Sequence, residues 1–248
     1  IRLVVSFKTP KPVKKDGRFK ITIQEKQIQL PLESRIDYIP SLNTKFRFNN
    51  FIVGDSNRFA NAACMAVAES PGQTYNPLFI YGGVGLGKTH LLHAIGNHVY
   101  ETRPEARILV ITAEKFIFDV VQKIRDNRMD EFREKYRNAD LLLVDDIQYL
   151  RGEATTEEFF HTFNELFNLD KQIVATSDSP PSELKLAERL KSRFGAGIIV
   201  DLQPAGFETR VAILKQKAKE ENKLVPDNVI AYIAEHIDTN IRALSLSL

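Results

Sequence analysis

The strongest signal in this sequence lies at residues 78–89, which read Leu78-Phe79-Ile80-Tyr81-Gly82-Gly83-Val84-Gly85-Leu86-Gly87-Lys88-Thr89. The apolar run at its start predicts a buried strand, and the periodicity of residues 90–100 predicts a helix directly after the glycines. The segment between them fits the pattern G-x-x-x-x-G-K-[ST], in which backbone N–H groups and the helix N-terminus point at phosphate oxygens. In that pattern Lys88 reaches the β and γ phosphates and Thr89 holds magnesium. The stretch therefore predicts a site for ATP or GTP.

Four more apolar runs have the length of buried strands, at residues 107–111, 141–144, 172–175 and 198–200. Each is bounded by helical or turn patterns, and continuous apolar runs are typical of strands covered on both faces of a parallel sheet. The alternation predicts a doubly wound α/β fold. Further helices are expected at residues 57–69, 208–221 and 226–236.

The chain divides into three predicted parts. Residues 7–18 are rich in Lys and Pro and are expected to form a linker, whereas residues 19–23 and 28–32 alternate as the strands of a hairpin do. Pro40 and Asn43 mark a break before the main domain. The expected parts are a linker and hairpin over residues 1–44, a nucleotide-binding core over residues 45–203 and a helical lid over residues 204–248. Because the chain begins without a methionine and ends inside a helical pattern, we expect it to be a portion of a longer protein.

The composition is that of a soluble globular protein, with 43% hydrophobic and 27% charged residues. The formal net charge of +2 is too small to argue for or against a nucleic-acid partner. The single cysteine, Cys64, lies in an apolar run, which predicts a buried thiol in a reducing compartment. The sequence has neither a signal-peptide pattern nor an apolar run of about eighteen residues, so we expect a cytoplasmic protein without a membrane segment. The five histidines lack metal-ligand spacing, which predicts packing or surface positions and no structural zinc.

A second motif, Asp145-Asp146, ends the predicted strand at residues 141–144. Ligands of a doubly wound sheet lie at the carboxyl edge of the strands, so both carboxylates should share an edge with the glycine-rich loop. Asp145 then suits the magnesium shell and Asp146 is placed to polarise the attacking water. The alternative is that the two acids only end the strand and cap the next element. The phosphate loop beside them favours the first interpretation.

Basic residues outside these motifs have open interpretations. Arg189 and Arg193 are four residues apart on one helix face. An arginine from a neighbouring subunit can neutralise charge on a γ phosphate. From the sequence alone, however, the favoured interpretation of Arg189, Arg193 and Arg242 is a solvated, salt-bridged helix end. Residues 113–138 form a predicted helical insertion in which basic and acidic residues are interleaved. Mixed charge of this kind usually marks a solvent-exposed face rather than a nucleic-acid contact. Aromatic residues at helical spacing in the next segment are expected in the core: Phe159, Phe160, Phe163 and Phe167.

Several blocks of the sequence resemble the AAA+ domain of the bacterial DnaA replication initiators. These blocks are residues 75–90, Asp145-Asp146-Ile147-Gln148, Glu158-Phe159-Phe160-His161-Thr162-Phe163-Asn164 and Arg189-Leu190-Lys191-Ser192-Arg193-Phe194-Gly195. The resemblance covers about residues 46–242. It implies a parallel sheet of order 5-1-4-3-2 flanked by helices, a small helical lid and ATP bound between them. It also implies that ATP-bound subunits stack into a filament on origin DNA and help to open the duplex, with slow turnover.

The resemblance implies roles for individual nucleotide-site residues. Lys88 and Thr89 resemble the Walker A pair, Asp145 and Asp146 resemble the Walker B pair, and Asp178 resembles the sensor of the γ phosphate. Magnesium is expected at Thr89 and Asp145. The residues expected to contact ATP or ADP are Ile52, Val53, Gly54, Gly83, Val84, Gly85, Leu86, Gly87, Lys88, Thr89 and His90.

For the three arginines, the resemblance favours a role in the nucleotide site over the salt-bridge interpretation. Arg193 resembles the finger inserted into a neighbour's site, Arg189 its assistant and Arg242 the lid sensor. Past the lid arginine the family continues Glu-Leu-Glu-Gly-Ala, whereas this chain ends Ala243-Leu244-Ser245-Leu246-Ser247-Leu248. The end of the lid is therefore expected to be altered or only partly represented.

For DNA, the resemblance implies that the insertion at residues 113–138 steers filament geometry and faces single-stranded DNA. After the second acidic motif the family carries a Lys and an Arg that grip this strand, where this chain reads Arg151-Gly152-Glu153-Ala154-Thr155-Thr156. The resemblance therefore does not predict a gripping role for this loop. The family's domain that reads duplex boxes lies outside this sequence, and so do the N-terminal parts expected to bind the replicative helicase.

Two alternative functions remain open at this point. One is a related AAA+ helicase loader or DnaA-like regulator, which would share the nucleotide site; the insertion at residues 113–138 and the long N-terminal linker favour the initiator. The other is a nucleotide-switched assembly module in which hydrolysis is incidental. Because a single subunit supplies no arginine finger to itself, we expect slow basal hydrolysis.

Overall fold

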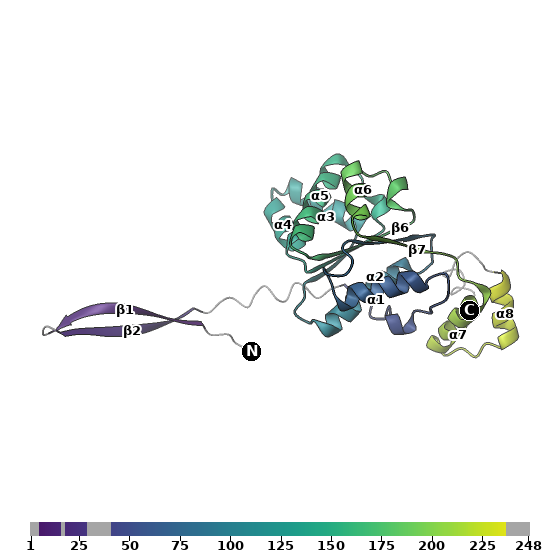
Figure 1. Cartoon of the computed structure of the whole chain (residues 1–248), viewed down its shortest axis with the longest axis horizontal. Helices are drawn as coiled ribbons and strands as arrows, with labels where there is room; N and C mark the ends of the chain where they lie inside the picture. The colour runs from purple at the N-terminus through teal and green to yellow at the C-terminus, as the bar shows by residue number, and fades with distance from the viewer. Residues whose placement is uncertain (1–4, 16–17, 29–40, 237–248) are drawn as a thin grey trace. The chain divides into compact units, whose positions relative to one another are not determined.

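The computed structural model describes residues 5–15, 18–28 and 41–236, and the chain falls into two units, Ile1–Ile39 and Pro40–Leu248. In the first unit, β1 (Val5–Lys15) pairs antiparallel with β2 (Arg18–Ile28) (Figure 1). The prediction of a linker over residues 7–18 is therefore wrong, because most of it forms a strand. Proline is tolerated where a strand has a free edge, and each strand of a two-stranded sheet has one. The strand expected at residues 28–32 lies, beyond Ile28, outside the described residues.

The second unit is built on a sheet of five parallel strands in the order β4-β5-β6-β3-β7. Numbered along the chain, this order is 2-3-4-1-5, which is 5-1-4-3-2 read from the other edge and confirms the predicted fold. Every residue of β5 and β6 is buried, as strands covered on both faces must be. The strands are β3 (Leu78–Gly82), β4 (Ile108–Thr112), β5 (Leu141–Asp145), β6 (Gln172–Ser177) and β7 (Ile198–Leu202).

Helices cover both faces of this sheet, with α1 and α2 on one side and α3 to α6 on the other (Figure 1). Each side has its own apolar core. Phe116 lies at the centre of one core, and its ring meets Phe132, Tyr136 and Phe159 edge to face. The helices are α1 (Arg58–Glu69), α2 (Lys88–Thr102), α3 (Ala113–Arg125), α4 (Met129–Arg137), α5 (Glu153–Asn168) and α6 (Glu188–Gly195), with short 3₁₀ turns η3 (Phe48–Asn50), η4 (Ile147–Tyr149) and η5 (Pro181–Glu183).

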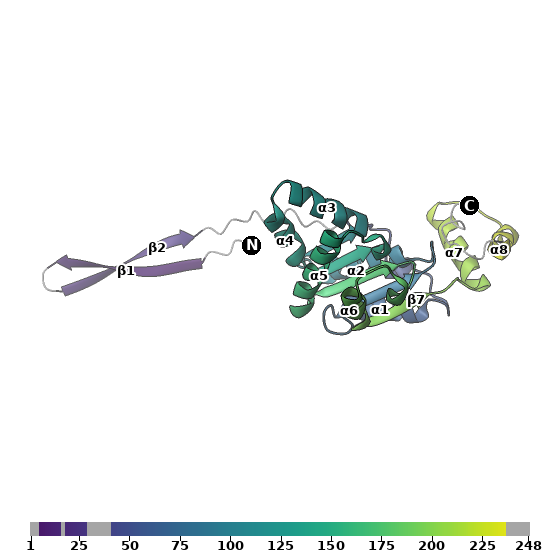
Figure 2. The ribbon, with the colours of Figure 1, turned by 90° about the horizontal axis from the view of Figure 1, so that it is seen from above.

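The insertion at residues 113–138 consists of two helices, α3 and α4, which lie side by side (Figure 2). The side chain of Thr112 caps α3 by accepting a hydrogen bond from Lys115 N. The chain turns at Asn127, whose φ of 52° is in the left-handed region. The charges predicted as a solvent face also join the helices, since Asp119 of α3 accepts hydrogen bonds from Lys135 and Tyr136 of α4.

Two helices follow the sheet, α7 (Phe207–Glu220) and α8 (Asp227–His236), and share a small core around Leu214, Ile230 and Ala234. Cys64 is buried on α1, as predicted, and burial raises the pKa of its thiol. Within residues 5–15, 18–28 and 41–236 no helix combines the length and apolar character needed to cross a bilayer.

Candidate nucleotide-binding site

The phosphate loop, residues 82–89, joins β3 to α2 at the carboxyl edge of the sheet. Gly85 and Gly87 have φ angles of 78° and 102°, a backbone conformation that favours glycine. A Cβ on Gly87 would lie 2.9 Å from Cε2 of Phe51, so space as well as φ excludes a side chain there. Gly87 also precedes the first turn of α2, whose N–H groups make this end of the helix suited to phosphate.

Lys88 lies almost fully buried beneath this loop. Its Nζ donates hydrogen bonds to the carbonyl oxygens of Gly82 at 2.7 Å and Gly83 at 2.8 Å. Burial lowers the pKa of Lys88, and the carboxylates of Asp146, Asp145 and Asp178 oppose that shift. The predicted lysine and the three predicted acids therefore converge on one edge of the sheet.

The hydroxyl of Thr89 donates to Oδ2 of Asp145 at 2.8 Å, which joins the two residues predicted to hold magnesium. A hydroxyl and a carboxylate are hard oxygen ligands, the kind that Mg²⁺ prefers, so this pair fits the ion. Asp145 is 9% exposed at the end of β5. Its carboxylate is bonded to Thr89, and its role as a magnesium ligand stays a prediction.

Asp146 follows with a φ of 57°, in the left-handed region that is uncommon for a residue with a side chain. It occupies the N-cap position of η4 without a side-chain capping bond. Instead, its Oδ1 accepts a hydrogen bond from Gln148 Nε2 at 3.0 Å. The side chain of Asp146 therefore makes no capping bond, and its role in polarising the attacking water stays a prediction.

Sequence reasoning missed two residues of this cluster, Gln148 and Thr176. The hydroxyl of Thr176, on β6, donates to Oδ1 of Asp145 and accepts the N–H of Asp146 at 3.0 Å. The signal was present, because Thr176 is a polar residue that directly follows an apolar run and directly precedes Ser177 and Asp178. Asp178 itself is exposed just beyond the carboxyl end of β6.

A cavity of about 470 Å³ opens beside the phosphate loop. Of the residues predicted to contact the nucleotide, Ile52, Leu86, Gly87 and His90 line it. The other seven do not line it, namely Val53, Gly54, Gly83, Val84, Gly85, Lys88 and Thr89. Val53 is 45% exposed, and Gly54 N donates to Asn57 Oδ1. The other lining residues come from residues 45–57 and from α7 with the residue after it, namely Lys45, Phe46, Asn50, Phe51, Asn57, Ile213, Gln216, Lys217, Glu220 and Glu221.

One wall of the cavity belongs to residues 43–52, which we call the strap. His90 of α2 stacks on Phe46 of the strap with ring centroids 4.9 Å apart, and meets Phe51 edge to face at 5.2 Å. Its Nε2 donates to the carbonyl oxygen of Arg47 at 2.8 Å. Burial is the largest cause that lowers the pKa of His90, which favours the neutral ring.

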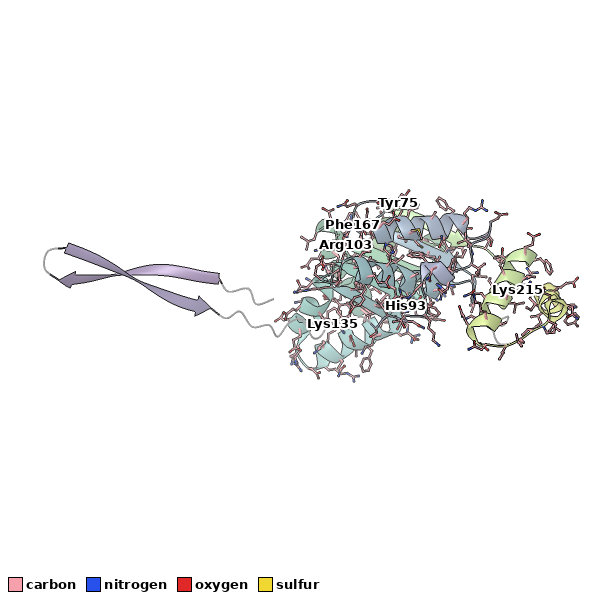
Figure 3. All side chains as sticks on the ribbon, turned by 90° about the horizontal axis from the view of Figure 1, so that it is seen from below. Tyr75, His93, Arg103, Lys135, Phe167 and Lys215 are labelled. Atoms are coloured by element: carbon pink, nitrogen blue, oxygen red, sulfur yellow. The ribbon has the colours of Figure 1, made fainter. Side chains whose placement is uncertain are left out.

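A second histidine of α2, His93 (Figure 3), also holds the strap. Its Nδ1 accepts the N–H of Asn43 at 3.1 Å. Burial lowers the pKa of His93 as well, against the opposing charge of Asp145. Asn97, one turn further along α2, donates to the carbonyl oxygens of Asn43 and Phe46. Of the two predicted positions, packing or surface, these two histidines take the first, and what they pack is the wall of the cavity beside the phosphate loop.

The two predicted finger arginines lie on α6, and neither lines the cavity. The guanidinium carbon of Arg189 lies 4.4 Å from the ring centroid of Phe160, and that of Arg193 lies 5.7 Å from the ring centroid of Phe167. Phe159 and Phe163 are buried as predicted, whereas the prediction that Phe160 and Phe167 are core residues is wrong in part, since both are only partly buried and pack against the core. Arg242 lies outside the described residues.

Comparisons with known proteins agree with this geometry. Residues 42–201 match the family described as the bacterial DnaA ATPase domain. The chain is 53% identical over 226 residues to the chromosomal replication initiator protein DnaA of Caldanaerobacter subterraneus subsp. tengcongensis, covering 90% of this chain and 51% of that protein. It is 54% identical over 212 residues to the DnaA of Thermoanaerobacter sp., covering 85% and 48%. The chain thus spans about half the length of the curated relatives it matches.

Solved structures give the same result. Domain III of the Thermotoga maritima replication initiation protein DnaA matches with a TM-score of 0.80 at 46% identity, covering 83% of this chain and 87% of that one. A structure of DnaA bound to AMPPCP and single-stranded DNA matches with a TM-score of 0.77 at 42% identity, covering 84% and 64%. The DnaC helicase loader, with a TM-score of 0.51 at 17% identity and coverage of 64% and 98%, shares the fold alone. On the family match and these identities, the chain belongs to the bacterial DnaA ATPase domain family.

Proposed function

We propose that this chain binds ATP or ADP with Mg²⁺ in the cavity beside the phosphate loop, and that its ATP-bound copies assemble on single-stranded origin DNA to promote duplex opening. The observation that carries the proposal is the meeting of Lys88, Thr89, Asp145 and Asp146 at one edge of the sheet, next to a cavity of about 470 Å³. A related DnaA bound to AMPPCP and single-stranded DNA supports it. We place this activity in the cytoplasm, as one step of replication initiation.

The residues divide the chemistry of hydrolysis among them. Magnesium, when bound, neutralises charge that develops on the phosphates, and Thr89 with Asp145 would hold it. Lys88 exchanges the carbonyl oxygens of Gly82 and Gly83 for phosphate oxygens. Asp146 orients the attacking water and accepts its proton, and Asp178 senses the γ phosphate from the neighbouring strand.

Charge neutralisation from a second copy completes the site. Arg193 and Arg189 rest on α5, outside the cavity of their own subunit, so they are available to a neighbouring subunit. Such an arginine is worth about 10³-fold or more in rate. The isolated chain should therefore hydrolyse ATP slowly, with Arg242 acting as the lid sensor once copies have assembled.

Single-stranded DNA is assigned to the outer face of α3. Phe118, Val121 and Ile124 are 58%, 39% and 47% exposed at spacings that put them on one face of the helix. Lys115 Nζ lies 4.9 Å from the ring centroid of Phe118, which brings a cation beside this apolar face. Exposed rings with nearby cations suit stacked bases and their phosphates. By contrast, Glu153 in the loop after the second acidic motif begins α5 and adds negative charge, so we assign no grip to that loop.

The alternatives differ from this proposal in partners rather than in the nucleotide site. The α3–α4 insertion favours an initiator over a helicase loader. We propose further copies of this chain as its main protein partner, and the replicative helicase as a partner of segments that its longer relatives possess. If hydrolysis is incidental and ATP acts as an assembly switch, Asp146→Asn should retain ATP-dependent assembly while losing turnover.

The nucleotide site is tested by titrating fluorescent ATP and by single-turnover hydrolysis. Lys88→Ala should weaken ATP binding by about tenfold or more, because a charge-assisted contact to phosphate is lost. Asp146→Asn should bind ATP as the wild type does and lose hydrolysis by about 100-fold. An unchanged ATP affinity in Lys88→Ala would contradict the proposal that the cavity beside the phosphate loop binds ATP.

A further inference from the structure

A buried hydroxyl sits in the middle of the catalytic edge of the sheet. Thr176 is 0% exposed on β6, the strand between the acidic strand β5 and the phosphate-loop strand β3. Its partner across the sheet is Ile80 of β3, and its predecessors Val174 and Ala175 are apolar. A buried hydroxyl without a hydrogen bond destabilises a fold, so the hydrogen bonds of Thr176 must offset that cost.

Those bonds both go to the Asp145-Asp146 pair. Thr176 Oγ1 donates to Oδ1 of Asp145, while Thr89 Oγ1 donates to Oδ2, so two hydroxyls from two elements fix the plane of one carboxylate. The same oxygen of Thr176 accepts the N–H of Asp146 at 3.0 Å. A hydroxyl donates and accepts at once, which neither an aliphatic side chain nor an ammonium group does.

The second bond fixes the backbone at Asp146. This residue has a φ of 57°, a conformation that is unfavourable for a residue with a side chain and persists only where its surroundings hold it. Its N–H is tied to Thr176, and its carboxylate accepts from Gln148. The turn that aims Asp146 into the site thus depends on the hydroxyl of the adjacent strand.

We propose that Thr176 is a positioning residue for ATP hydrolysis, which holds Asp145 toward Thr89 and holds the backbone turn that aims Asp146. It acts through these two acids, so the inference rests on the function proposed above and adds a residue to it. A residue that orients a metal ligand without touching the metal typically contributes about 10–100-fold to metal affinity or activity.

The test compares Thr176→Val, which keeps the shape and removes the hydroxyl, with Thr176→Ser, which keeps the hydroxyl. Thr162→Val is the matched control, because Thr162 is equally buried and its Oγ1 has no hydrogen-bond partner within the described part of the chain. Four quantities are measured for each: the single-turnover rate, the Mg²⁺ concentration that half-maximally slows release of fluorescent ATP, the Mg²⁺-free affinity for ADP, and the Tm without nucleotide.

For Thr176→Val we expect a rate lower by about 10–100-fold and an Mg²⁺ midpoint higher by about tenfold, with Mg²⁺-free ADP affinity within about twofold of the wild type. Thr176→Ser should restore both affected quantities to within a few fold. Thr162→Val should leave the rate, the Mg²⁺ midpoint and the Mg²⁺-free ADP affinity close to the wild type, with a Tm no lower than that of the wild type, because an unbonded buried hydroxyl is removed. A Thr176→Val protein with an unchanged Mg²⁺ midpoint and rate would overturn the inference. So would a loss of Mg²⁺-free ADP affinity equal to the loss of rate, or equal losses in Thr162→Val, because either would indicate general damage to the fold.

Asp145→Asn separates this inference from the function on which it rests. If Asp145→Asn loses its Mg²⁺ dependence while Thr176→Val keeps the Mg²⁺ midpoint and the rate of the wild type, the inference alone fails. If Asp145→Asn behaves as the wild type, the proposed magnesium site fails instead.

Discussion

Gly87 shows how strongly a single residue constrains the phosphate loop, because both its φ of 102° and its contact with Phe51 exclude a side chain. We predict that Gly87→Ala lowers the free energy of unfolding by about 1–3 kcal/mol and abolishes nucleotide binding. Gly195→Ala is the control, since no heavy atom of the described residues lies within 4 Å of a Cβ added there and its φ is not positive. Urea unfolding of both variants measures the difference; equal stabilities would contradict the assignment of strain to Gly87.

The histidines that fasten the strap make stability depend on pH. Burial lowers the pKa of His90 and His93 in the folded chain below the ordinary value of 6.5. Between that value and the lower folded pKa the unfolded chain binds more protons, so stability is fully present above pH 6.5 and is lost as pH falls through this window.

Urea unfolding at about pH 7.5 and about pH 5.5 tests this dependence. The wild type should be less stable at the lower pH, and a His90→Phe/His93→Phe variant should lose much of the difference. His161→Phe is the control, because His161 is about half exposed on α5 and should leave the difference intact. A pH dependence that persists unchanged in the double variant would show that other groups cause it.

The positions of the residues proposed to carry the phosphate and metal chemistry were predictable, because fixed spacing ties them to a loop, a helix start and a strand end. Thr176 and Gln148 were not, since their partners Asp145 and Asp146 are reached across the sheet or around a left-handed turn that no local pattern specifies. Phe160 and Phe167 kept helical spacing and still lie partly outside the core. Their positions depend on α6, which brings two arginines over them.

At the scale of elements, Glu158 joins α5 to α4. It is 9% exposed and accepts a hydrogen bond from Arg137 at 2.8 Å. We predict that Glu158→Gln lowers the free energy of unfolding by about 1–3 kcal/mol, because it leaves a partly buried guanidinium with one carboxylate fewer. Asp130→Asn should have no measurable effect, since this fully exposed side chain pairs with Arg133 only at 3.7 Å. Thermal unfolding of the two variants checks the prediction, which fails if Glu158→Gln melts with the wild type.

The five strands of the core were predicted to within two residues at each end, because apolar runs mark them clearly. Their carboxyl ends were missed where polar residues continue a strand, as Thr176 and Ser177 do in β6. The prediction failed outright in β1, where lysines and prolines indicated a linker and the pairing with β2 is a long-range property. The insertion was predicted as helical, but its division into α3 and α4 at Asn127 was not.

At the scale of the whole molecule, sheet order places the site. β3 lies between β6 and β7, so the phosphate loop emerges beside Thr176 and Asp178, and β5 brings Asp145 and Asp146 from the next strand along. Periodicity predicts such strands but not their order, which came from the family resemblance and is confirmed by the structure. The site faces the strap and α7, while the finger arginines lie on α6. This separation is what a site completed by a second copy requires.

The most direct test is sedimentation velocity of this chain with ADP and with AMPPCP, each with and without single-stranded DNA, for the wild type and Arg193→Ala. The account predicts that only the wild type with AMPPCP forms larger species, that single-stranded DNA increases them, and that Arg193→Ala remains monomeric with every nucleotide. Identical sedimentation of the wild type with ADP and AMPPCP, with DNA present, would contradict ATP-dependent assembly through α6.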